Sequence, residues 1–320
     1  MIKRKRIVVS AILGASLLIL SACSAGAPAK TEGPAPAAET AEVKVTHELG
    51  ETAVSKEPKR VVIFDYALLD LLDNMDVEIV GLPKANIPPL LSAYGDEKYE
   101  NVGTLQEPDF EKVFALEPDL ILISTRTVAH YEELSKIAPT LYMAVDNDDY
   151  LASVEKNALT LGEIFNKTEV VEEKVASLKE RAAAIREKAS SLEENALVLL
   201  ANDGSLSAYG PGSRFGFLYG DLGMKPADPG IEVSTHGQSV TFEYVLEKDA
   251  DYIFVVDRAG VVGGTVTAES MFENDIVKRT KAYAEDRIIY LDPFVWYVTS
   301  GGITGTEKML DEVEEALNKK

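Results

Sequence analysis

The sequence predicts an α/β protein in which two lobes with mostly parallel sheets are joined by one long α-helix. Three observations support this fold class. Short apolar runs typical of buried strands alternate with helical patterns in both halves of the chain. One helix–strand motif occurs twice, and one long apolar stripe with helical spacing lies between the two halves.

The amino-terminal residues 1–22 read as a signal peptide. A basic start is followed by an apolar stretch too short to span a bilayer comfortably, and the stretch ends in small residues. The segment 20–23, Leu-Ser-Ala-Cys, resembles a bacterial lipobox, which implies that Cys23 is lipidated and becomes the new amino terminus. Because Cys23 is the only cysteine, we expect no disulfide in the folded part.

Residues 23–45 are expected to be the lipidated cysteine and a flexible tether, because they are rich in Ala, Pro, Thr and Glu and lack apolar periodicity. The formal charge of the chain is −21. The leader carries four basic residues and no acid, so the remainder carries about −25. Such a negative charge argues against nucleic acid as a partner and against a polybasic surface through which the protein would bind a membrane.

The amino-terminal lobe is expected over residues 46–166. Apolar runs of strand length lie within 60–65, 77–82, 119–124 and 140–145, and helical patterns lie at 66–75 and 130–138. Strands that alternate with helices predict a parallel sheet covered on both faces.

The segment 167–195 is expected to be one connecting helix of about 25 residues, roughly 37 Å long. Thr168 is a suitable N-cap. A coiled-coil helix with an outside partner is the alternative to a strut that joins the lobes. The apolar positions recur at steps of four and three: Val171, Val175, Leu178, Ala182, Ile185, Ala189 and Leu192.

The carboxy-terminal lobe is expected over residues 196–320, with strand-like runs within 196–203, 251–257 and 287–292. Residues 241–258 match residues 109–126 without a gap at six of eighteen positions. Each copy reads as a short helix, a turn and a buried strand that ends in an arginine, Arg126 or Arg258. The alternative is a common helix–strand idiom with no relation between the lobes.

Ligands of open α/β sheets bind beyond the carboxyl ends of the strands. Under the two-lobe interpretation, Arg126 and Arg258 therefore enter one shared cleft and present cations to an anionic ligand. On local grounds three other features have ordinary alternatives. Arg214 in a Gly/Pro loop could be a surface arginine, His236 in a polar loop is more typical of a surface residue, and Trp296 beside Tyr297 is more typical of the core.

Several separate motifs resemble the catecholate-siderophore-binding lipoproteins of ABC iron importers, especially their petrobactin- and enterobactin-related branch. The motifs lie in the family order at 102–113, 136–142, 201–204, 210–216, 234–258 and 288–302. The resemblance runs from about residue 46 to the carboxy terminus. It implies the helical-hinge class of substrate-binding proteins, whose fold is two α/β lobes on a helical backbone.

Carried over position by position, the resemblance implies a set of functional residues. The cleft arginines fall on Arg126, Arg214 and Arg258, and the iron-contacting residues fall on His236 and Tyr297. Trp296 is expected at the cleft, where its fluorescence would report a ligand.

The resemblance also implies the partners of the protein. One glutamate per lobe, Glu111 and Glu243, docks onto arginines of the importer permease. The chain is expected to be a monomer outside the cytoplasm, held on the cell membrane by the lipid on Cys23. It carries no cofactor of its own, because Fe(III) arrives with the siderophore.

The chemistry of the ligand agrees with these residue types. Planar guanidinium groups donate several charged hydrogen bonds to the peripheral oxygens of an anionic ferric catecholate. A hexadentate siderophore saturates the metal, whereas a tetradentate one leaves two positions that His236 and Tyr297 could fill. Phenolate oxygen is a hard donor suited to Fe(III).

The alternatives are a binding lipoprotein for another anionic iron chelate, haem or cobalamin, a Mn or Zn importer component and, least favoured, an anchored hydrolase. A Mn or Zn importer component would need several His and carboxylate ligands, and the chain has only three scattered histidines. Three cleft arginines suit a ligand with several anionic oxygens better than they suit haem or cobalamin. An anchored hydrolase would need an activated nucleophile, and no Ser or Cys motif supports one, so we expect no enzymatic activity.

Overall fold

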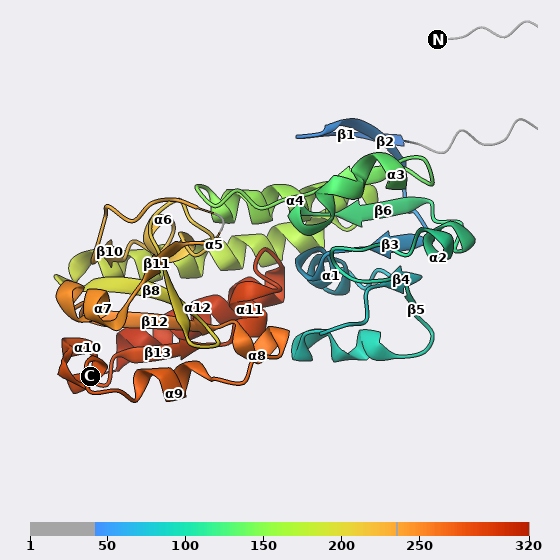
Figure 1. The fold of residues 1–320 in the computed structure, drawn as a ribbon. Coiled ribbons are helices and arrows are strands. Elements are labelled where there is room, and N and C mark those ends of the chain that lie inside the picture. The colour runs from blue at the N-terminus through green and yellow to red at the C-terminus, as the bar shows by residue number, and fades with distance from the viewer. Residues whose placement is uncertain (1–41, 235, 320) are drawn as a thin grey trace, which may run out of the picture. The chain divides into compact units, whose positions relative to one another are not determined.

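The computed structural model describes residues 42–234 and 236–319. These residues form two lobes, each built from one main sheet and surrounding helices (Figure 1). The predicted signal peptide, Cys23 and most of the predicted tether lie outside the described residues. The strand β1, Glu42–His47, begins inside the segment expected to be tether and pairs antiparallel with β2, Gly50–Ser55. Among the described residues, none of the helices has the length and apolarity needed to cross a membrane.

The sheet of the amino-terminal lobe has the order β5-β4-β3-β6-β7, and every pair in it is parallel. Its strands are β3 (Val61–Ile63), β4 (Gly81–Leu82), β5 (Glu100–Asn101), β6 (Leu120–Ile123) and β7 (Thr140–Tyr142). The helical segments are α1 (Tyr66–Asp73), η1 (Pro89–Gly95), α2 (Phe110–Ala115), η2 (Thr125–His130), α3 (Tyr131–Leu134) and α4 (Tyr150–Ile164).

The sheet of the carboxy-terminal lobe has the order β11-β9-β8-β12-β13, with β10 pairing beside β8. Its strands are β8 (Asn195–Asn202), β9 (Ser205–Tyr209), β10 (Lys225–Pro226), β11 (Gln238–Val240), β12 (Tyr252–Asp257) and β13 (Ile288–Leu291). The helical segments are α6 (Phe217–Gly220), α7 (Phe242–Lys248), α8 (Ala259–Val262), α9 (Ala268–Phe272), η3 (Val277–Arg279), α10 (Lys281–Ala284), α11 (Pro293–Tyr297) and α12 (Ile303–Asn318).

The predicted fold class is confirmed, and the antiparallel part of the second sheet has a local cause. The strands β8, β10, β12 and β13 are parallel, whereas β9 runs antiparallel to β8 and β11 runs antiparallel to β9. Asp203 and Gly204, which join β8 to β9, both have positive φ angles of 48° and 95°. An Asp-Gly pair with both φ angles positive is the preferred two-residue hairpin turn.

The long helix α5, Thr168–Ser191, has 24 residues and packs against both α4 and α12. Figure 1 shows α4 and α5 side by side. Six of the seven predicted stripe residues are buried in the helix, and Leu192 ends it as the C-cap. The stripe is covered by helices of the same chain, which favours the strut over the coiled coil. Thr168 is the first helical residue, and Lys167 takes the N-cap position without a side-chain bond.

The two copies of the repeated motif have the same local structure. Asp109 caps α2 and Thr241 caps α7, each by accepting a backbone N–H three residues later. Before β6, Asp119 accepts two backbone N–H groups just ahead of β3, at 2.7 and 2.8 Å. Before β12, Asp251 accepts the N–H of Asn195 at the start of β8, at 3.0 Å. Each repeat therefore ties its own strand to the central strand of its lobe.

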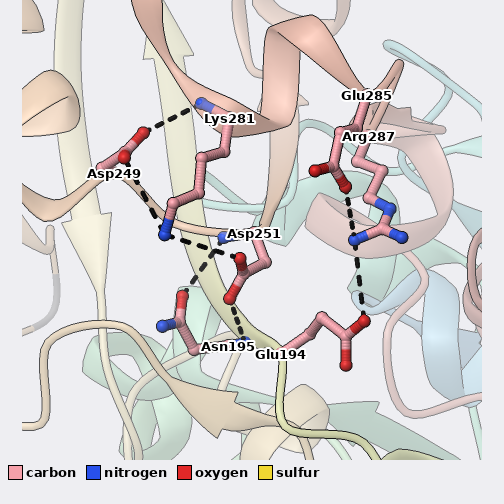
Figure 2. A network of polar contacts seen from close by, with 7 residues as sticks. All are labelled: Glu194, Asn195, Asp249, Asp251, Lys281, Glu285 and Arg287. Carbon is pink, nitrogen blue, oxygen red and sulfur yellow. Dashed lines mark hydrogen bonds and ion pairs between the residues drawn. The ribbon is translucent and has the colours of Figure 1, made fainter.

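A network of charged groups closes the amino-terminal end of the second sheet (Figure 2). Lys281 lies 3.8 Å from Asp251, and Arg287 lies 2.8 Å from Glu285 and 3.8 Å from Glu194. The side chains of Lys281 and Glu285 are well exposed and those of Asp251, Arg287 and Glu194 are partly buried. Solvent therefore still screens these pairs, and each contributes about 1 kcal/mol or less to stability. The network lies at the starts of β8 and β12, the opposite end of these strands from the arginine that follows β12.

The two lobes contact each other through buried polar groups. Asp70 of α1 accepts the N–H of Gly305 in α12 at 2.9 Å and the side-chain amide of Asn74 at 2.9 Å. The hydroxyl oxygen of Tyr150 in α4 accepts the N–H of Gly301 at 2.8 Å. A side chain at Gly302 would collide with Asp70, and Gly301 has a positive φ angle of 112° and lies close to Val145, so each of the paired glycines before α12 has its own steric reason.

The buried carboxyl of Asp70 should make the stability of the fold depend on pH. Burial raises its pKa to about 6, although hydrogen bonds from Gly305 and Thr304 lower it. An acid whose pKa is raised on folding stabilises the fold below about pH 4, and this contribution is lost as pH rises through about 6. Unlike the parent, Asp70→Asn should lack this component of the pH dependence, on the order of 1–3 kcal/mol in the free energy of unfolding.

Urea unfolding of the parent and of Asp70→Asn at several pH values between 4 and 7.5 measures this difference. The exposed Asp76→Asn is the matched control, because it makes the same chemical change on the surface after α1. If the parent and Asp70→Asn change in parallel across this range, the carboxyl of Asp70 does not carry the effect.

Candidate ligand-binding cleft

A pocket of about 600 Å³ lies where the carboxyl ends of the first sheet face loops of the second lobe. The first lobe contributes residues within 65–68, 124–126 and 143–147, which follow β3, β6 and β7, and Asn157 of α4. The second lobe contributes residues within 212–214, 233–234 and 297–301. This is the position at which open α/β sheets bind ligands.

The first wall of the pocket includes one buried carboxyl, that of Asp65, directly after β3. Asp65 accepts the N–H groups of Ala67 and Leu68 at 2.8 and 3.0 Å and so caps α1. Burial raises the pKa of Asp65, and the charge of Arg126 acts in the opposite direction. Asp65 is not among the site residues predicted from the sequence, although the strand-end rule that predicts Arg126 applies to it equally.

Arg126 and Arg214 reach one acceptor from opposite lobes. Arg126 follows β6, and its Nη2 donates to the backbone carbonyl of Tyr297 at 2.8 Å. Arg214 follows the Gly/Pro loop after β9, and its Nη2 donates to the same carbonyl at 2.8 Å. Both arginines line the pocket. The structure therefore brings together two cations that lie 88 positions apart in the sequence.

Arg258 reaches the same tyrosine through its side chain. Its Nε donates to the hydroxyl oxygen of Tyr297 at 2.9 Å, and its Nη1 donates to the amide oxygen of Asn202 at 2.9 Å. Arg258 is not one of the pocket-lining residues, whereas Tyr297 is. Arg126 and Arg258 thus contact the same tyrosine from opposite lobes, but only Arg126 lines the pocket, so a contact between Arg258 and a ligand stays a prediction.

The three guanidinium groups surround the ring of Tyr297. Their central carbons lie 4.0 Å (Arg214), 5.6 Å (Arg258) and 5.7 Å (Arg126) from the ring centroid, within the range of cation–π interaction. Burial lowers the pKa of Arg214, and the nearby charge of Arg126 lowers it further. We call Arg126, Arg214 and Arg258 the arginine triad.

The triad also changes the acidity of the phenol. Burial by itself raises the pKa of Tyr297, but the hydrogen bond from Arg258 and the three positive charges outweigh burial and hold this pKa below its ordinary value. The phenol of Tyr297 therefore loses its proton more easily here than in water. The resulting phenolate is the form that binds Fe(III).

Trp296 does not lie at the pocket, and the expectation that it contacts the ligand is corrected. Its side chain is 0% exposed and is not among the pocket-lining residues. Its ring Nε1 donates to a carboxylate oxygen of Glu312 in α12 at 2.6 Å, and the ring packs near Phe217. Trp296 and Tyr297 are neighbours in a short helix, so their side chains leave it in different directions and only Tyr297 reaches the triad.

His236 lies on an exposed turn before β11 and is not among the pocket-lining residues. Val233 and Ser234, which precede it in the same loop, do line the pocket. A contact between His236 and iron therefore stays a prediction. Within residues 42–234 and 236–319, no three His, Cys, Asp or Glu side chains are grouped so that they could hold a metal ion.

Glu111 and Glu243 are exposed in the first turns of α2 and α7. The ring of Phe110, beside Glu111, contacts that of His130 at the end of η2, the segment that carries Arg126. The ring of Phe242, beside Glu243, contacts Phe272 of α9, whose first residue donates a backbone N–H to Asp257 at the end of β12. Both glutamates thus lie at the strand-end edge of their own lobe.

Comparison with known proteins gives a consistent result. The profile described as "Periplasmic binding protein" matches residues 61–294. The petrobactin-binding protein YclQ of Bacillus subtilis is 42% identical over 87% of this chain and 89% of its own length. A crystal structure of YclQ covers 88% of this chain and 100% of its own with a TM-score of 0.85.

Two further relatives have related names. The ferric-anguibactin-binding protein FatB of Vibrio anguillarum is 33% identical over 85% of this chain and 86% of its own length. The crystal structure of the periplasmic catecholate-siderophore binding protein VctP of Vibrio cholerae is 34% identical, with a TM-score of 0.83 over 86% of this chain and 100% of that one.

Proposed function

This chain belongs to the periplasmic binding protein family. We propose that it works outside the cytoplasm, where it captures a ferric catecholate-type siderophore in the cleft and delivers it to the permease of an ABC importer. Relatives whose names state a ferric siderophore or petrobactin as ligand support this function. The observation that carries it is the arginine triad, in which both lobes direct cations to one pocket.

The size and charge of the pocket agree with such a ligand. About 600 Å³ lies in the ordinary range for a small-molecule site. A guanidinium group that is already desolvated in the free protein contributes more binding free energy with an anionic oxygen than an exposed one does, because less water has to be displaced on binding. A ferric catecholate supplies several such oxygens around its metal and so can contact several members of the triad at once.

The finer parts of the proposal are the identity of the ligand and the attachment of the protein. We propose petrobactin or a close analogue, on the strength of the YclQ relative. We also propose a monomer anchored through lipid on Cys23, which docks onto the permease through Glu111 and Glu243. No catalytic turnover of the ligand is part of the proposal.

A ligand panel tests the proposal. The soluble domain is titrated with ferric petrobactin, a ferric tris-catecholate, ferric citrate, haem and cobalamin, and binding is followed by calorimetry and by quenching of Trp296 fluorescence. The tryptophan does not need to contact the ligand, since iron–catecholate absorption quenches by energy transfer over longer distances. Tighter binding of haem or cobalamin than of every ferric siderophore would refute the proposed ligand class.

His236 and Tyr297 should matter only when the siderophore leaves iron positions open. The double variant His236→Ala with Tyr297→Phe should bind a hexadentate ferric catecholate nearly as the parent does, because no position on that metal is free. The variant should lose affinity for a tetradentate ferric catecholate and also the phenolate–iron charge-transfer band seen with the parent. The absorption spectrum and a titration measure both effects, and equal losses for the two ligand types would indicate packing rather than coordination.

A further inference from the structure

The side chain of Tyr297 lies close to all three arginines of the triad. The face of its ring lies 4.0 Å from the central carbon of Arg214, and its hydroxyl oxygen accepts the Nε–H of Arg258. The remaining member of the triad, Arg126, lies 5.7 Å from the ring centroid. One phenol therefore gives a π face and an oxygen acceptor to three cations at once.

The charge balance of the cleft explains why the cations gather on this ring. Three guanidinium groups that are partly withdrawn from water repel one another, and a nearby anion or electron-rich ring offsets the repulsion. The nearest pocket carboxyl is that of Asp65, which acts on Arg126 and is already bound to two N–H groups of α1. For Arg214 and Arg258 the phenol of Tyr297 fills this role.

The ring can leave without disturbing the helix that carries it. The backbone carbonyl of Tyr297 accepts hydrogen bonds from Arg126 and Arg214, and these bonds do not involve the ring. Tyr297 is the last residue of α11, and its side chain is only partly buried beside the pocket. Rotation about its side-chain bonds can therefore open the triad while α11 stays in place.

A phenol is chemically close to one arm of a catecholate, since both are hydroxylated aromatic rings. We infer that Tyr297 is an internal substitute for the ligand: in the free cleft its ring holds the position between the guanidinium groups that a catecholate arm takes when the ligand binds. This inference rests on the proposed function and adds a specificity element to it. A ligand must replace both the π face and the oxygen acceptor, which a catecholate does and an aliphatic carboxylate does not.

A chemical rescue experiment tests the inference without any siderophore. In Tyr297→Ala the triad loses its ring, and p-cresol, which is the free tyrosine side chain, should bind in the vacated position. We expect saturable binding by calorimetry with a dissociation constant on the order of 1 mM and a rise in melting temperature at about ten times that concentration. Tyr297→Phe keeps the ring in place and is the matched control, so it and the parent should bind no p-cresol.

A second probe separates the triad from an ordinary cavity. The saturated alcohol 4-methylcyclohexanol has nearly the same shape but no π face, and we expect at least tenfold weaker binding to Tyr297→Ala. Tyr297→Ser is tested in parallel, so that a folding defect of one variant does not decide the result, and circular dichroism verifies both folds.

The inference is overturned if neither folded variant binds p-cresol, if the parent binds it equally well, or if the saturated alcohol binds equally well. These outcomes are independent of the proposed function, which fails if the parent binds no ferric siderophore or binds haem or cobalamin more tightly than every ferric siderophore.

Discussion

Replacing Arg214 with alanine is expected to weaken the binding of a ferric tris-catecholate by roughly ten- to a hundredfold, because one charged hydrogen-bonding partner is worth about 1.5–3 kcal/mol. Arg214 lies closest of the three cations to the ring of Tyr297 and lines the pocket. Its desolvation is already present in the free protein and lowers its pKa. The fold should survive, since removing a buried cation also removes its repulsion from Arg126.

Calorimetric titration of the soluble domain measures the loss. Arg126→Ala and Arg258→Ala should weaken binding in the same direction, and Arg214→Lys should lie between parent and alanine, because lysine keeps the charge but lacks the planar fork. The exposed Arg279→Ala removes the same charge outside the pocket and should bind like the parent. If all three triad variants bind ferric catecholates as the parent does, the cleft is assigned wrongly.

Replacing both Glu111 and Glu243 with alanine is expected to stop siderophore uptake through the cognate importer while leaving siderophore affinity unchanged. The two carboxylates occupy matching positions of the repeated motif, one per lobe, in the exposed first turns of α2 and α7. Both lie at the strand-end edge of their lobes but outside the residues that line the pocket. A permease that binds Glu111 and Glu243 at the same time could distinguish one separation of the two lobes from another.

Uptake of radioactive iron by cells that carry the anchored double variant measures this effect. The double variant Glu172→Ala with Glu187→Ala is the matched control, because it removes two exposed carboxylates from α5 and changes the net charge equally. Normal uptake by a correctly anchored Glu111/Glu243 variant would return both residues to ordinary solvated helix carboxylates. Loss of uptake by the α5 control as well would attribute the effect to net charge.

Local patterns in the sequence were sufficient for the elements that carry the lobes. Six of the seven predicted stripe residues are buried in α5, because these apolar positions repeat at the period of a helix face that must be buried. The strands β3, β6, β8 and β12 are predictable for a different reason, since a strand buried on both faces is apolar without alternation. The antiparallel β9 was missed, although the Asp203–Gly204 pair carries a hairpin signal.

The sequence by itself also determined that Arg126 and Arg258 follow equivalent strands, because the repeated motif fixes them at the same distance from the same capped helix. Only the tertiary structure decided that the triad converges on Tyr297, which lies 171 positions from Arg126. It also decided that Trp296 turns into the core and that Asp65 lines the pocket. A local sequence pattern indicates whether a side chain is buried. The groups that a buried side chain contacts depend on packing between elements distant in sequence, and no periodic pattern in the chain reports that packing.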